Sequence, residues 1–123
     1  MSKLYKVLTQ QEFKQISETK ETAWTGTELD KKDGFIHLST KSQAVGVMNR
    51  FFSQYDVAYV YCLNLADIDH LIKWEPPILP GTKQLEKMDH SDLFPHAYGT
   101  LDMSDLSNII IHNKVGSSFP DLP

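Results

Sequence analysis

The sequence predicts a single α+β domain, and three observations support this fold class. The chain has 123 residues, 41% of them hydrophobic and 23% charged, which suits one globular domain covering residues 1–123. Segments with strand and helix patterns are mixed, without the strict alternation of a parallel sheet. The final third consists mainly of strand-like and loop-like segments.

The N-terminal part predicts a strand, a helix and a long loop. Residues 4–8 alternate weakly and include Tyr and Val, which favours a first strand. Thr9 and Glu12 have the spacing of a capping box, so we expect a helix from there to about Ser17. Residues 18–32 are mostly polar, and we expect them to form a loop.

The next segment predicts a strand followed by a helix. We expect residues 35–38 to be extended, with Ser39 or Thr40 capping a helix that runs to about Phe52. Four apolar residues recur at helical spacing and would form its buried face: Ala44, Met48, Phe51 and Phe52.

The second half predicts further strands. Residues 57–63 are apolar on both faces, which is typical of a central strand. We expect a helical turn within 66–71 and a short strand through residues 73 and 74. Residues 96–101 and 108–112 are expected to pair as the last two strands.

Two segments are expected to be irregular. Prolines and Gly81 interrupt residues 76–93, which we interpret as a mobile insertion. The tail 116–123 contains two prolines and is expected to fray.

Charge and composition exclude several classes of partner. The net charge is −4, and no basic cluster is longer than Lys31 and Lys32, so we expect no nucleic-acid partner. No segment approaches the roughly 20 apolar residues of a membrane span, and no signal peptide is expected. The single cysteine, Cys62, suits a reducing environment. These features favour a cytoplasmic protein, and they leave its oligomeric state open.

The octapeptide DGFIHLST, residues 33–40, is the first candidate site. In a strand, Phe35, His37 and Ser39 would share one face. The following strand-to-helix junction would offer backbone N–H groups to a ligand oxyanion. The alternative is that His37 is a hydrogen-bonded structural residue.

The hexapeptide FPHAYG, residues 94–99, is the second candidate. In an extended chain His96 and Tyr98 would lie on one face, offering an imidazole and a stacking surface together. The alternative is a strand edge whose aromatic side chains only pack.

The Trp74-Glu75 pair is the third candidate. A carboxylate beside an indole at a strand end could have a raised pKa and act as an acid or base, or it could hold ligand hydroxyls. The alternative for Glu75 is an ordinary solvated acid.

Other familiar chemistries lack their motifs. The sequence has no G-x-S-x-G, H-E-x-x-H or C-x-x-C motif and no glycine-rich phosphate loop. An acid and imidazole cluster matches no recognised set of metal ligands, so we predict no metal ligands for the site and keep metal binding as a minor alternative. The cluster consists of Asp89, His90, Asp92 and His96.

Four segments in this order resemble the bacterial family known as domain of unknown function 952. They are Tyr5-Lys6, residues 33–39, Trp74-Glu75 and residues 94–99, and the likeness runs from about Leu4 to Leu101. DGFIHLST and FPHAYG together are fairly specific. The stretch between Glu75 and Phe94 is longer than the family pattern.

This resemblance implies an ADP-ribosyltransferase-like fold, a split, mostly antiparallel sheet with flanking helices. It also implies a cleft that binds NAD or a related nucleotide, and thus a glycosyltransferase-type enzyme with NAD as substrate. We expect His37, Glu75 and His96 to be catalytic. The expected ligand-binding residues are Tyr5, Lys6, Ser39, Thr40 and Tyr98.

Two other roles stay open. The first strand carries Tyr5-Lys6 where the superfamily has a His or Arg, and no Glu-x-Glu pair occurs. These departures favour a non-catalytic module that binds a nucleotide or another small anion. A protein-interaction surface formed by Trp24 and residues 76–93 is a further alternative.

Overall fold

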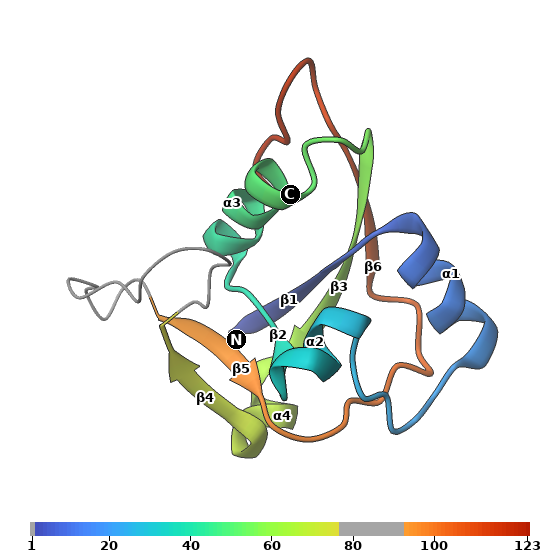
Figure 1. The fold of residues 1–123 in the computed structure, drawn as a ribbon, viewed down its shortest axis with the longest axis vertical. Helices are drawn as coiled ribbons and strands as arrows, with labels where there is room; N and C mark the ends of the chain where they lie inside the picture. Colours follow the sequence, from blue (N-terminus) through green and yellow to red (C-terminus); the bar gives the residue numbers. More distant parts are fainter. Residues whose placement is uncertain (1, 77–92) are drawn as a thin grey trace.

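The computed structural model describes residues 2–76 and 93–123 as one α+β domain with two small antiparallel sheets and flanking helices (Figure 1). The first sheet has the strand order β1-β3-β6, with bounds Lys3–Leu8, Val57–Asn64 and Ile109–Asn113. The second has the order β2-β5-β4, with bounds Ile36–His37, Phe94–Ala97 and Ile72–Glu75. An isolated bridge between Tyr5 and Ser39 links β1 to the chain just after β2.

The central position of β3 confirms what its apolar sequence predicts. β3 pairs antiparallel with β1 on one side and with β6 on the other. Because both of its edges are paired and both of its faces are covered, a continuous apolar run is stable there.

The predicted pairing of the last two strands is wrong. β5 pairs with β2 and β4, whereas β6 pairs with β3. An alternating pattern identifies a strand and its two faces, but it does not identify the strand's partner.

The two long helices begin where the sequence predicts. α1 (Gln10–Thr19) is capped by Thr9, whose hydroxyl accepts from the backbone of Glu12. α3 (Lys41–Phe51) is capped by Thr40 in the same way. A short helix, α4 (Leu65–Ile68), and a 3₁₀ turn, Asp69–Leu71, precede β4.

The prediction that residues 18–32 form only a loop is wrong. Helix α2 (Glu28–Asp33) occupies the end of this segment. Its N-cap is Thr27, which forms a capping box with Asp30, a signal of the same kind as the one at Thr9.

The first sheet lies between two hydrophobic clusters. One contains Leu4 and Leu8 of β1, Ile16 of α1, and Ile36 and Ala97 of the second sheet. The other lies on the opposite face of β1 and contains Tyr5 and Val7 together with apolar residues of α3, notably Ala44 and Met48. Figure 1 shows α1 and α3 on the two sides of this sheet. The alternation of β1 thus supplies both clusters.

The C-terminal tail packs against the domain, contrary to the prediction that it frays. Phe119 is 3% exposed and Leu122 is 4% exposed. Both belong to the second hydrophobic cluster, the one between β1 and α3, which we call the cluster below α3. The Asn49 side chain donates to the Phe119 carbonyl and accepts from its N–H, at 3.2 and 2.6 Å. The free energy gained by burying two large apolar side chains outweighs the cost of ordering the irregular, proline-containing backbone.

The predicted mobile insertion, residues 76–93, falls almost entirely on residues 77–92, outside the described residues. In the described parts of the chain, no helix is long and apolar enough to cross a membrane.

Candidate functional site

The second sheet has one apolar face and one polar, aromatic face. Ile36 and Ala97 are paired across β2 and β5 and point into the hydrophobic core. His37 pairs with His96, and Lys73 also pairs with His96, so these three side chains point to the opposite face. We call this face, with Phe35, Glu75 and Tyr98 at the next positions of the same alternation, the polar face.

Phe35 lies at the centre of an aromatic cluster on the polar face. Its ring centroid is 4.0 Å from that of His96, 4.7 Å from that of His37 and 5.5 Å from that of Tyr98. The two histidine rings lie 5.6 Å apart in an edge arrangement. Side chains of the first two candidate segments, residues 33–40 and 94–99, therefore meet on one face.

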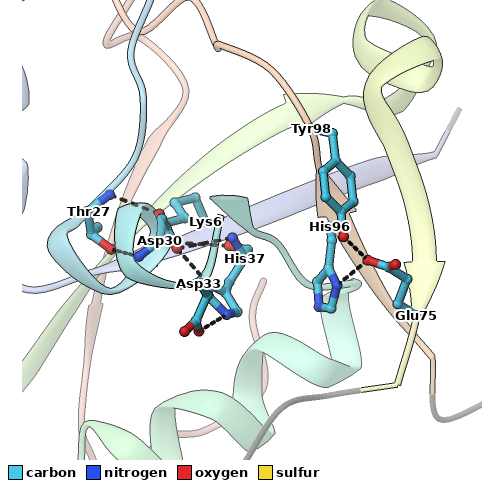
Figure 2. A network of polar contacts seen from close by, with 8 residues as sticks. All are labelled: Lys6, Thr27, Asp30, Asp33, His37, Glu75, His96 and Tyr98. Carbon is cyan, nitrogen blue, oxygen red and sulfur yellow. Dashed lines mark hydrogen bonds and ion pairs between the residues drawn. The ribbon is translucent and has the colours of Figure 1, made fainter. Parts of the chain in front are cut away.

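Glu75 binds two side chains of β5 and its extension (Figure 2). Its Oε1 accepts from the Tyr98 hydroxyl at 2.6 Å and lies 2.8 Å from Nδ1 of His96. The Tyr98 hydrogen bond is the main reason that the pKa of Glu75 lies below its ordinary value, with His96 contributing in the same direction against partial desolvation. The sequence-based prediction of a raised pKa for Glu75 is thus wrong.

His96 is a neutral imidazole of defined tautomer. Burial, which leaves the residue 2% exposed, lowers its pKa and outweighs the opposing effect of Glu75. Because the ionised Glu75 carboxylate can only accept a hydrogen bond, Nδ1 of His96 carries the proton. Nε2 therefore keeps its lone pair and can accept a proton or a hydrogen bond.

Tyr98 is the exposed end of this group. The hydrogen bond to Glu75 raises the pKa of Tyr98 to about 12, so its hydroxyl stays protonated. The residue is 37% exposed, and the Lys73 ammonium lies 4.8 Å from the ring centroid. An aromatic surface and a cation thus stand side by side at the edge of the polar face.

His37 is held between two carboxylates, and the sequence did not predict either of them as its partner. Its Nδ1 lies 2.6 Å from Oδ1 of Asp30, and its Nε2 lies 3.0 Å from Oδ2 of Asp33 (Figure 2). The backbone N–H of His37 also donates to Asp30 Oδ1, at 3.1 Å. Asp30 therefore fixes both the backbone and the ring of His37.

Asp30 is ionised although it is 1% exposed. Burial acts to raise its pKa, but hydrogen bonds from His37 and Lys6 and the Lys6 charge outweigh this effect and hold the pKa well below its usual range. The Lys6 Nζ lies 2.8 Å from Asp30 Oδ2 and also donates to the His37 carbonyl at 3.0 Å. Lys6, expected to bind ligand, has its ammonium bound inside the protein.

A local signal could have identified Asp30. Thr27 and Asp30 have capping-box spacing, and Asp30 Oδ2 accepts from the Thr27 N–H. Gly26 is needed beside this helix start, because a Cβ there would lie 2.5 Å from the Asp30 Cβ and its φ is +107°. The contacts with Lys6 and His37, in contrast, depend on the fold.

Three of the predicted ligand-binding residues have structural roles: one packs in the hydrophobic core, one pairs with a neighbouring strand through its backbone, and one caps a helix. The Tyr5 side chain belongs to the hydrophobic cluster below α3, across β1 from Lys6. Ser39 is buried and exchanges backbone hydrogen bonds with Tyr5, and Thr40 caps α3. We therefore leave these three residues out of the candidate site.

Metal ligands do not gather in the described ranges, 2–76 and 93–123, where no group of three or more His, Cys, Asp or Glu side chains could hold a metal ion. Three members of the acid and imidazole cluster considered above fall outside those ranges: Asp89, His90 and Asp92.

Comparison with known proteins identifies a family and solved structures with a similar fold. A family model described as "Protein of unknown function (DUF952)" matches residues 7–109. No curated protein matches the sequence. The crystal structure of protein CC0527 from Caulobacter crescentus superposes with a TM-score of 0.74 at 22% identity, covering 98% of this chain and 94% of that one. Its solution NMR structure gives a TM-score of 0.71 at 23% identity, covering 98% and 92%. This likeness shows the fold alone.

Proposed function

We propose that this chain, which belongs to the DUF952 family, binds a nucleotide such as NAD on the polar face and breaks its N-glycosidic bond, as an ADP-ribosyltransferase-like enzyme would. One observation carries the proposal. His37 and His96 are direct cross-strand partners, and each has its Nδ1 held by an ionised carboxylate. Oriented imidazoles with lowered carboxyl pKa values are typical of sites that handle protons or positive charge.

The chemistry assigns Glu75 an electrostatic role. As the bond between the ribose C1′ and the nicotinamide nitrogen breaks, its electron pair leaves with nicotinamide and positive charge develops on the ribose. The ionised carboxylate of Glu75 stabilises that charge. The hydroxyl oxygen of water or an acceptor then bonds to C1′, and its proton goes to Nε2 of the neutral His96, directly or through water.

The exposed rim of the polar face suits the rest of a nucleotide. The half-exposed ring of Tyr98 can stack on a base, and the Lys73 ammonium beside it can neutralise a phosphate. Holding both ends of the ligand would place the glycosidic bond near Glu75.

A non-catalytic binding module is the second candidate, and the position of Lys6 favours it. Lys6 stands on β1, where the resemblance leads one to expect a ligand-holding cation, yet its ammonium is bound to Asp30 and the His37 carbonyl. A protein with this arrangement could bind a nucleotide and leave its bonds intact.

Calorimetry and nicotinamide release separate the two candidates. The purified protein is titrated with NAD and with ADP-ribose, and nicotinamide is measured by chromatography after incubation with NAD. The enzyme proposal predicts binding together with nicotinamide release, and loss of at least about tenfold in rate for Glu75→Gln, since one electrostatic group is removed. The matched control is Glu18→Gln, an exposed glutamate on α1. Binding without release supports the module, and no binding by a folded protein contradicts both.

A further inference from the structure

Nε2 of His37 is occupied by a carboxylate of the protein itself. Asp33 ends helix α2, and its Oδ2 lies 3.0 Å from this nitrogen. Figure 2 shows this contact. The His37 side chain is 27% exposed and that of Asp33 is 21% exposed, so the contact is partly accessible to solvent.

The other side of the His37 ring is anchored far more firmly. Asp30 is 1% exposed and binds His37 twice, Lys6 through both carboxylate oxygens, and the Thr27 backbone. Removal of Asp30 from this position would leave the Lys6 ammonium buried without its counter-charge.

Asp33 has much weaker support. Within the described ranges its carboxylate forms one ion pair, with His37. It stands at the C-terminus of α2, where the negative end of the helix dipole disfavours a carboxylate. Gly34 follows at a φ of +87° and turns the chain so that His37 returns within reach.

We infer that Nε2 of His37 is a subsite for a phosphate oxygen of the ligand, and that the Asp33 carboxylate holds this subsite until the ligand displaces it. The inference rests on the proposed function and names the ligand group that His37 recognises. A phosphate oxygen can take the place of Asp33 Oδ2, 3.0 Å from Nε2, and carries at least the same charge. The displaced Asp33 side chain turns into solvent, while Asp30 keeps the ring in place.

The subsite discriminates between ligands by their phosphates. ADP-ribose and NAD carry a diphosphate that can replace Asp33, whereas adenosine carries none. Because Asp33 competes for the same nitrogen, its negative charge lowers the affinity for phosphate-bearing ligands without affecting a nucleoside.

The test compares the wild type with Asp33→Asn and Asp33→Ala by calorimetry, with inorganic pyrophosphate, ADP-ribose and adenosine as probes. The matched control is Asp69→Asn, an exposed aspartate in the 3₁₀ turn, which changes the net charge equally. Removing a partly exposed competing carboxylate should tighten pyrophosphate and ADP-ribose about two- to fivefold. Asp69→Asn should leave both affinities unchanged, and melting curves verify that each variant is folded.

Each possible result either supports or overturns the phosphate subsite. Tighter binding of both phosphate probes by either Asp33 variant, with adenosine unaffected, supports the subsite. Unchanged or weaker binding of ADP-ribose by both folded Asp33 variants overturns the inference and leaves the proposed function standing. Equal tightening by Asp69→Asn overturns it as a general charge effect. If neither the wild type nor any variant binds ADP-ribose or NAD, the proposed function fails. The pyrophosphate titrations then test the subsite by themselves. Tighter pyrophosphate binding by the Asp33 variants supports the subsite, and any other result overturns it.

Discussion

His37 and His96 are direct partners across β2 and β5, with ring centroids 5.6 Å apart. They are 59 positions apart in the sequence, and Nδ1 of each histidine lies within hydrogen-bond distance of a different carboxylate. One carboxylate, Asp30, is buried, and the other, Glu75, lies at the sheet edge. The two histidines therefore connect a buried carboxylate and a partly exposed carboxylate on one face of the sheet.

Replacing Asp30 with asparagine should destabilise the protein strongly. The substitution leaves the buried Lys6 ammonium without its counter-charge and His37 without its buried anionic partner, so we expect a loss of about 3–5 kcal/mol in the free energy of unfolding. Urea denaturation at pH 7 measures this value. The exposed control Asp69→Asn should change it by less than about 0.5 kcal/mol, and a similarly small change for Asp30→Asn would contradict the role assigned to Lys6 and His37.

Acid should destabilise the wild type through Asp30. The folded pKa of Asp30 lies below its unfolded value of about 4, so its stabilising contribution is complete above that value and is lost as the pH falls towards the folded pKa. The free energy of unfolding, followed from pH 5 to pH 2, should therefore fall. Asp30→Asn should flatten this dependence, whereas the exposed variant Asp121→Asn should retain it. Parallel curves for the wild type and Asp30→Asn would speak against a lowered pKa.

The hydroxyl of Tyr98 should ionise late. An ultraviolet titration of the wild type should contain a tyrosine component near pH 12, because the hydrogen bond to Glu75 stabilises the protonated phenol. In Glu75→Gln this component should move towards the ordinary value of about 10. It should be missing from Tyr98→Phe and present in Tyr55→Phe, which alters another exposed tyrosine.

The imidazole of His96 should become harder to protonate without Glu75. Burial already lowers the pKa of His96, and the Glu75 carboxylate opposes that effect. NMR titration of the ring should therefore give a still lower pKa in Glu75→Gln than in the wild type. A higher pKa for His96 in the variant would show that Glu75 is not its partner in solution.

Phe119 should contribute substantially to stability. Truncating this 3% exposed side chain to alanine leaves a cavity below α3, and we expect a loss of about 3–5 kcal/mol in the free energy of unfolding. Val115, which is 69% exposed, provides the control, since Val115→Ala should cost less than about 0.5 kcal/mol. A negligible effect of Phe119→Ala would restore the original expectation of a frayed tail.

Much of the local structure was predictable from short sequence patterns. The capping boxes at Thr9 and Thr40 mark the starts of α1 and α3, and the alternation around His37 correctly places Phe35 on the same face. The box at Thr27 was equally readable and marks the helix that we did not predict. These signals act over two to four residues, so the sequence displays them directly.

The connections between elements were not predictable in the same way. β5 resembles a partner for β6 in its pattern, yet it pairs with β2 and β4. Lys6 looks like a solvent-facing cation on a first strand, yet Asp30 pairs with it from twenty-four positions away. Neither the strand pairing nor the ion pair produces a pattern in neighbouring residues, because strand partners and buried ion pairs depend on the packing of the whole domain.

The amino-acid order alone determined where the long helices begin, which residues alternate into the core, and that His37, Glu75, His96 and Tyr98 stand in extended segments. Tertiary structure decided that these side chains meet around Phe35 and how they are charged. The physical reason is that ionisation depends on desolvation and on neighbouring charges and hydrogen bonds. Glu75 acquires its hydrogen bond from Tyr98 only when β4 and β5 have paired.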